Sequence, residues 1–189
     1  MKTGALLLAA GYSNRFGGIK LGALLPDGQT VFQHTLGNLN DAVKDVLVIS
    51  REELLPLLVS NDSQAEIRTF AGAESGMGAT LAFGITQVDH WDACLVCLAD
   101  MPLISIQTYR LLCDALRPDR IVLPSFNGKT GNPVGFGHAF FAELRALAGD
   151  AGGRQVIQRH ADKCLQVDVD DPGIHFDIDT PADLAGYGE

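Results

Sequence analysis

The sequence predicts an α/β fold, a three-layer sandwich in which a mainly parallel, twisted sheet lies between two layers of helices. Short apolar runs alternate with segments of helical periodicity, which is the pattern of right-handed strand–helix–strand crossovers. Several runs are apolar at every position, as strands buried on both faces must be. No repeat, low-complexity stretch or linker divides the 189 residues. We therefore expect one domain over residues 1–189.

Six apolar runs are expected to be the strands of this sheet. They are residues 5–10, 45–50, 65–71, 93–99, 120–124 and 164–169. The first, second and fourth runs are apolar throughout, which predicts burial on both faces. The third run is weaker, and the last alternates between apolar and polar residues.

Seven segments between or after these runs are expected to be helical. They are residues 30–43, 51–60, 77–88, 105–116, 138–147, 152–160 and 180–187. Ser105 is the expected N-cap of its helix, and Thr180 before Pro181 is a second N-terminal pattern. The stretch 125–137 is rich in Gly, Asn and Pro, which predicts a turn or hairpin.

The net charge of −9 argues against affinity for nucleic acid or for an anionic membrane surface. It does not exclude an anionic small substrate, because local cations decide such binding. No apolar run reaches the length of about 20 residues that a membrane span needs. The apolar run near the N-terminus is expected to be a strand and not a signal peptide, because it is short. We therefore expect a cytoplasmic protein without nucleic-acid or membrane partners.

Cys94 and Cys97 form a C-x-x-C pattern within an apolar run. Such a pattern can indicate zinc or redox chemistry. On a strand, however, positions i and i+3 point to opposite faces, so the two thiols cannot share a ligand. We interpret both as small core residues.

The run at 5–10 is followed by a loop whose only formal charges are two cations, Arg15 and Lys20. Ligands of open α/β sheets bind at the carboxyl ends of the strands, which is where this loop begins. Its glycines at 11, 17 and 18 allow backbone N–H groups to approach a ligand closely. The loop suits a polyphosphate, although it matches neither the P-loop nor the dinucleotide fingerprint. A glycine-rich turn with solvated cations remains the alternative at this point.

The motifs around this loop resemble those of a known enzyme family. LAAGYSNRFGGIKL resembles the signature of the sugar-nucleotide-type nucleotidyltransferases, and more closely the branch that attaches a nucleotide to molybdopterin. Five further segments resemble family motifs in the same order along the chain: SGMGATLAFG (75–84), CLADMPLI (97–104), TGNPVGFGHAFFAEL (130–144), GDAGGRQVI (149–157) and FDIDTPADL (176–184). Within that family, Leu-Ala-Ala-Gly at 8–11 is typical of the cytidylyl-transferring members and Leu-Ala-Gly-Gly of the guanylyl-transferring ones.

The resemblance implies the Rossmann-like architecture of nucleotide-diphospho-sugar transferases and a Mg²⁺-dependent reaction. A terminal phosphate of molybdopterin would attack the α-phosphorus of CTP, transfer CMP and release pyrophosphate. A phosphate monoester is already ionised near neutral pH, so no general base is needed. The implied substrates are CTP and molybdopterin, with a molybdoenzyme or its maturation chaperone as protein partner. Alternatives are GTP as donor, a sugar or alcohol phosphate as acceptor, and a nucleotide-binding protein without turnover.

The resemblance also implies roles for individual residues. The expected catalytic residues are Arg15 and Lys20, which would hold the β- and γ-phosphates, and Asp100, which would hold the metal ion. The nucleobase and ribose would meet Leu8, Ala9, Ala10, Gly11, Ser75, Gly76 and Met77. The molybdopterin would meet Asn132, Pro133 and Arg154.

Three carboxylates are candidate Mg²⁺ ligands, because this ion binds through one or two carboxylates together with substrate phosphates. Asp100 follows the strand at 93–99, although it could instead cap the next helix. Asp177 and Asp179 are two residues apart and share one face of an extended segment. One of them is expected to supply a second carboxylate, although Asp179 or Thr180 could instead cap the last helix. The sequence leaves these alternatives open.

Overall fold

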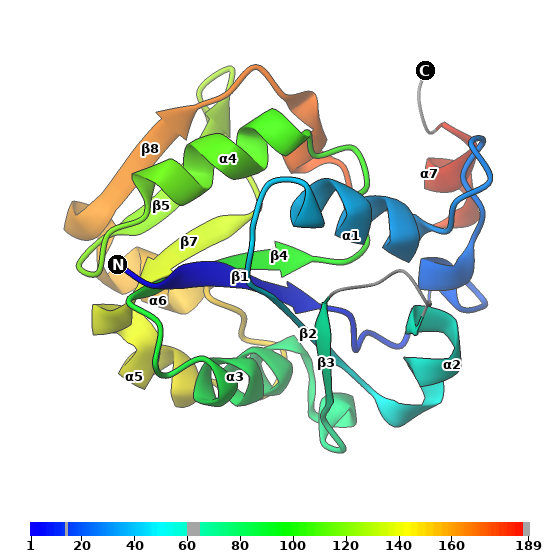
Figure 1. The fold of residues 1–189 in the computed structure, drawn as a ribbon, viewed down its shortest axis with the longest axis horizontal. Coiled ribbons are helices and arrows are strands. Elements are labelled where there is room, and N and C mark those ends of the chain that lie inside the picture. The colour runs from blue at the N-terminus through cyan, green and yellow to red at the C-terminus, as the bar shows by residue number, and fades with distance from the viewer. Residues whose placement is uncertain (14, 60–64, 187–189) are drawn as a thin grey trace.

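The computed structural model describes residues 1–13, 15–59 and 65–186, and it has the expected three layers (Figure 1). The strands are β1 (Thr3–Leu8), β2 (Val46–Ser50), β3 (Glu66–Thr69), β4 (Ala93–Leu98), β5 (Ile121–Phe126), β6 (Lys129–Thr130), β7 (Val134–Gly137) and β8 (Cys164–Asp168). Their order across the sheet is β3-β2-β1-β4-β7-β5-β6, and β8 pairs with β5. The pairings of β1 with β2 and β4, of β2 with β3 and of β5 with β8 are parallel. The prediction of a mainly parallel α/β sheet is confirmed.

The helices cover both faces of this sheet. They are α1 (Val31–Asn40), α2 (Leu55–Leu58), α3 (Met77–Gln87), α4 (Ile106–Ala115), α5 (Phe141–Arg145), α6 (Arg154–Arg159) and α7 (Pro181–Ala185). Figure 1 shows α1 and α4 on one face of the sheet, with α3 and α5 on the other. None of the helices in the described part of the chain is long and apolar enough to cross a membrane.

Alternating residues of the strands divide the core into two clusters, one on each face. Ala5 and Leu7 of β1 pack with residues of α1 and α4, whereas Leu6 and Leu8 pack with residues of α3, α5 and α6. Because side chains alternate between the two faces of a strand and both faces of this sheet are covered by helices, every buried position of β1 has to be apolar. The same alternation separates the cysteines of β4.

Cys97 lies in the core cluster of α1 and α4, and Cys94 in that of α3, α5 and α6. Both side chains are completely buried. Burial raises the pKa of both thiols, because a thiolate would lose its hydration there. The interpretation of these cysteines as core residues is confirmed.

The stretch 125–137 contains more structure than the predicted turn or hairpin. Strands β5 and β6 do form a hairpin, in which Ser125 pairs with Thr130. The chain then returns as β7, which inserts between β4 and β5 and pairs antiparallel with both. The glycines of β7 hid this strand from the apolar pattern. Gly137 is needed there, because a Cβ would lie 2.3 Å from the carbonyl oxygen of Pro118.

Most of the predicted helices are shorter than the sequence pattern suggested, and residue 187 of the predicted helix 180–187 lies outside the described residues. The difference is clearest in two of them. In 51–60, a 3-10 turn (Glu52–Leu54) leads into the single turn of α2, Val59 is extended, and residue 60 lies outside the described residues. Pro56 lies in the first turn of α2, where its missing N–H is tolerated. In 138–147, a 3-10 turn (His138–Phe140) precedes the short α5.

Candidate active site

The carboxyl ends of β1 and β4 are neighbours, because Leu8 pairs with Leu98. Hydrogen bonds hold the residues that follow each strand. The Ala99 N–H donates to the Leu8 carbonyl at 3.1 Å, and the Ala9 N–H donates to the Ile49 carbonyl at 2.8 Å. The buried Ser50 hydroxyl at the end of β2 donates to the Ala9 carbonyl at 3.2 Å. The loop after β1 therefore starts from a fixed position beside the residue that follows β4, Ala99.

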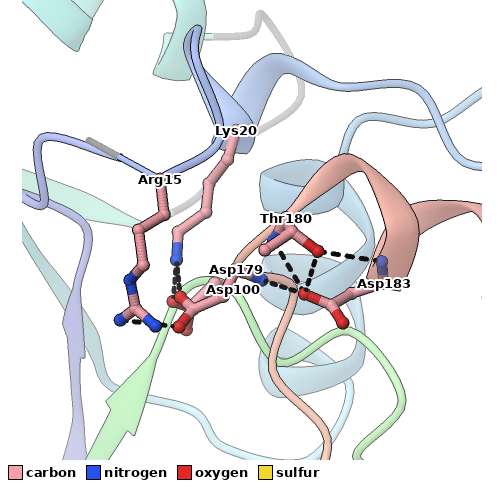
Figure 2. A network of polar contacts seen from close by, with 6 residues as sticks. All are labelled: Arg15, Lys20, Asp100, Asp179, Thr180 and Asp183. Carbon is pink, nitrogen blue, oxygen red and sulfur yellow. Dashed lines mark hydrogen bonds and ion pairs between the residues drawn. The ribbon is translucent and has the colours of Figure 1, made fainter.

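Two cations of this loop and two distant carboxylates form one network (Figure 2). Lys20 Nζ lies 2.6 Å from Asp100 Oδ2 and 2.8 Å from Asp179 Oδ1. An Arg15 Nη lies 2.8 Å from Asp179 Oδ2. The Lys20 side chain is 12% exposed and that of Arg15 is 77% exposed, so Lys20 makes the better shielded contacts. The structure thus places both cations on the same side of the sheet as Asp100.

The segment before α7 brings the remaining carboxylates to Asp100. Ile178 is fully buried in the core, and its N–H donates to the Asp100 carbonyl at 2.9 Å. Because side chains alternate along an extended segment, Asp177 and Asp179 leave the core on the other side. One oxygen of each of these two residues and one of Asp100 all lie within 4.8 Å of one another.

Helix capping does not occupy these carboxylates, which settles two alternatives. Ser105 caps α4, because its hydroxyl accepts from the Thr108 N–H at 3.2 Å. Thr180 caps α7, because its hydroxyl accepts from the Asp183 N–H at 3.3 Å, while Asp183 accepts from the Thr180 N–H at 2.7 Å (Figure 2). Asp100 and Asp179 are therefore available for other partners.

The three carboxylates fit a hard divalent cation. Oxygen donors are what Mg²⁺ and Mn²⁺ bind in proteins. Oδ1 of Asp100 is buried and has no hydrogen-bond partner among the described residues, which is unfavourable for a carboxylate oxygen unless a ligand satisfies it. Lys20 Nζ sits against Asp100 and Asp179, so this position already attracts a positive charge.

The electrostatics of the network agree with this interpretation. Burial lowers the pKa of Lys20, but the carboxylates of Asp100 and Asp179 outweigh it, so the pKa is raised and the ammonium stays charged. Partial burial raises the pKa of Asp177, and repulsion by Asp179 and Asp100 adds to the rise. Carboxylates that repel one another in this way gain from a bound cation.

A cavity of about 390 Å³, the first cavity, opens beside this network. Its lining includes eight of the residues expected from the sequence: Leu8, Ala9, Ala10, Gly11, Lys20, Gly76, Met77 and Asp100. It also includes residues that the sequence reasoning did not single out: Tyr12, Ser13, Leu21, Ala73, Glu74, Thr80, Leu98, Ala99 and Asp150. Ser75 is exposed and lies outside this lining, although Ala73 and Glu74 of the same 3-10 turn belong to it. Arg15 lies outside the lining as well and reaches the network from the loop.

A second cavity of about 850 Å³ adjoins the first, and the two share lining residues: Leu8, Met77, Leu98 and Asp150. Of the residues expected to meet the acceptor, Asn132 and Arg154 line the second cavity. Pro133, which is buried and follows a cis peptide bond, does not. Other polar residues of this lining are Thr130, Gln155 and Gln158.

Asp150 reaches both cavities because two glycines let its loop approach the start of α3. A Cβ on Gly76, whose φ is +103°, would lie 2.4 Å from Asp150 Oδ1. The Gly78 N–H donates to the Gly149 carbonyl at 2.7 Å. The available sequence signal was the pair of motifs at 75–84 and 149–157, but only the fold shows that they touch.

The sequence is similar to known proteins over most of its length. Residues 5–164 match the family described as the MobA-like NTP transferase domain. The chain is 30% identical over 190 residues to purine catabolism protein PucB of Bacillus subtilis, which covers 93% of this chain and 91% of PucB. It is 26% identical over 197 residues to the molybdenum cofactor guanylyltransferase of Vibrio cholerae, which covers 98% and 91% of the two chains.

Solved structures agree on the fold. Rv0371c of Mycobacterium tuberculosis superposes with a TM-score of 0.84 at 23% identity, covering 98% of this chain and 96% of that one. The complex of Rv0371c with manganese gives a TM-score of 0.81 at 21% identity, covering 98% and 97% of the two chains. The family match is broader than the cytidylyl branch that the motifs suggested, and the two curated relatives carry different functional names. The chain belongs to the MobA-like NTP transferase family.

Proposed function

We propose that this protein transfers CMP from CTP to molybdopterin in a magnesium-dependent reaction that releases pyrophosphate. The observation that carries the proposal is the network of Lys20 and Arg15 with Asp100 and Asp179 at the edge of the first cavity. It combines cations that suit a triphosphate with carboxylates that suit a metal ion. Transfer from a nucleoside triphosphate uses both, because cations and a metal ion neutralise the charge of the phosphates.

The roles of the residues follow from the charges. Lys20 and Arg15 would exchange their carboxylate partners for the β- and γ-phosphates of the nucleotide, where they stabilise the departing pyrophosphate. Asp100, with Asp179 and Asp177, would hold the ion. The bound ion would neutralise the negative charge that develops on the phosphates. These residues position and stabilise the reactants, which is the main task in phosphoryl-type transfer.

The acceptor would lie in the second cavity and reach the nucleotide across the shared wall. An oxygen of its terminal phosphate forms a bond to the α-phosphorus, and the bond between that phosphorus and the oxygen bridging to the β-phosphorus breaks. Arg154 offers a cation to the acceptor, and Asn132 offers an amide. Because the attacking phosphate is already ionised, no side chain has to remove a proton.

The choice of CTP rests on Ala10, which replaces the first glycine of the guanylyl-type motif Leu-Ala-Gly-Gly. Its side chain is 4% exposed and lines the first cavity. GTP is the second candidate, because the Vibrio cholerae relative is named a guanylyltransferase.

The test is incubation with Mg²⁺ and each of CTP, GTP, ATP and UTP, with molybdopterin, a sugar phosphate or an alcohol phosphate as the acceptor. Pyrophosphate release and the mass of the product are measured. We expect CTP to be preferred over GTP by orders of magnitude, and chelation of the metal to stop the reaction. A preference for GTP would contradict our interpretation of residues 8–11. Product formed only with a sugar or alcohol phosphate would show that molybdopterin is not the acceptor. No pyrophosphate release with any combination would overturn the proposal.

A further inference from the structure

Arg51 directly follows β2, at the same edge of the sheet as the charged network, and its side chain is mostly buried. The side chain is 15% exposed, and its Nε is buried without a hydrogen-bond partner among the described residues. Its ion pair with Glu53 is long, at 3.6 Å, and the Glu53 side chain is 69% exposed. Such a solvent-screened pair holds a guanidinium weakly. The guanidinium makes a further contact of a different kind.

The ring of Tyr12 provides that contact. Cζ of Arg51 lies 4.4 Å from the ring centroid, which is a cation–π distance. Tyr12 is 43% exposed and lines the first cavity. The same residue therefore rests on Arg51 and forms part of the cavity wall.

Tyr12 lies between Gly11, which has open space beside it, and Ser13, whose backbone conformation is uncommon. A Cβ on Gly11 would meet nothing within 4 Å. Ser13 has a φ of +54°, in the left-handed region that residues other than glycine rarely adopt. Backbone N–H groups in such turns are well suited to bind anions. A contact that fixes the Tyr12 ring therefore also fixes the backbone on both sides of it.

The contact between Tyr12 and Arg51 differs from the other side-chain contacts of this loop in one respect. Arg15 and Lys20 contact carboxylates, and they must exchange these partners when a nucleotide and a metal ion bind. Neither Arg51 nor Tyr12 is a proposed ligand of the ion. Their contact can therefore persist in the free and in the nucleotide-bound protein.

We propose that Arg51 is a positioning residue that acts through Tyr12. It holds the ring in place so that the backbone from Gly11 to Ser13 keeps the geometry that receives the triphosphate. This inference rests on the function proposed above.

Isothermal titration calorimetry with CTP and Mg²⁺ tests it on the wild type, Tyr12→Leu, Tyr12→Phe, Arg51→Met and the double variant Arg51→Met/Tyr12→Leu. We expect Kd to rise about tenfold in Tyr12→Leu and in Arg51→Met, with no further rise in the double variant. Tyr12→Phe keeps the ring face and should bind within about twofold of the wild type. At saturating CTP, kcat should stay near the wild-type value in all variants, because the contact positions the donor and does not touch the reacting atoms.

Arg120→Met is the matched control. It removes one positive charge at the opposite edge of the sheet, before β5, from a side chain that is 44% exposed. It should leave the Kd for CTP unchanged. That result would show that the effect of Arg51→Met comes from the contact with Tyr12 and not from the loss of a positive charge in general. If Arg51→Met does not fold, Tyr12→Leu still tests the inference, because Tyr12 is partly exposed and its substitution should leave the fold intact. Wild-type affinity in Tyr12→Leu, additive effects in the double variant, or a Tyr12→Phe as weak as Tyr12→Leu would overturn the inference. A wild type that binds no CTP in the first titration would instead overturn the proposed function.

Discussion

The two cavities at the carboxyl edge of the sheet share a wall, but their chemistry differs. The first adjoins a network in which Lys20 lies within 2.8 Å of two carboxylates. The second is lined mostly by apolar residues and by neutral polar ones such as Asn132 and Gln155, and its charged residues are Asp150 and Arg154. Opposite charges held this close suit phosphates and a metal ion, whereas amides suit hydrogen-bonding edges of a neutral ring system. Under the proposed function, this difference would assign the chemistry to the first cavity and the recognition of the acceptor to the second.

The largest effect is expected from Asp100→Asn, which keeps the shape of the side chain and removes its charge. We expect kcat to fall about 1000-fold, because the ion loses its best shielded carboxylate. Pyrophosphate release measures the rate, and Mn²⁺ binding followed by electron paramagnetic resonance measures the site itself. Asp114→Asn, on the exposed side of α4, is the control and should behave as wild type. Wild-type turnover in Asp100→Asn would contradict the assignment of Asp100 as a metal ligand.

Lys20→Met should raise the Kd for CTP and Mg²⁺ about 100-fold, the upper range for loss of a charge-assisted hydrogen bond. Calorimetry measures this value. Lys163→Met removes an equivalent charge from a side chain that is 48% exposed in a 3-10 turn before β8, and it should change nothing. An unchanged affinity in Lys20→Met would place the triphosphate elsewhere.

Gly76→Ala tests the wall that the two cavities share. The new methyl group would meet Asp150 Oδ1 at 2.4 Å and backbone of Gly149 at 2.6 Å, at a φ of +103°. We expect the free energy of unfolding to fall by about 1–3 kcal/mol and the KM values of both substrates to rise. Ser75→Ala, one residue earlier and outside the lining, is the control. A rise in only one KM would show that the cavities are independent at this point.

Arg154→Gln should give the smallest effect and confine it to the second cavity. We expect the KM for molybdopterin to rise about tenfold, because one charged hydrogen bond is lost, while the Kd for CTP stays unchanged. Steady-state kinetics and calorimetry separate the two. Arg159→Gln lies on the same helix, but outside the cavity lining, and serves as control. Weaker CTP binding in Arg154→Gln would mean that the two cavities do not divide the substrates.

Local patterns in the sequence were sufficient for much of the fold. The unbroken apolar run at 93–99 predicted β4 with cysteines facing both layers, because side chains alternate along a strand. Ser105 was recognisable as a cap, because capping depends on residues three positions apart. Strand β7 was missed, because its glycines carry no apolar signal and its partners lie elsewhere in the chain.

The sequence by itself determined which residues carry charge at the ends of the strands: Arg15 and Lys20 after β1, and Asp100 after β4. The tertiary structure decided that these meet Asp179, that Thr180 and not Asp179 caps α7, and that Asp150 joins the two cavities. The physical reason is the range of the forces involved. Propensity and capping act over a few residues, whereas contacts between residues 80 and 159 positions apart depend on the pairing of Leu8 with Leu98 and on the burial of Ile178.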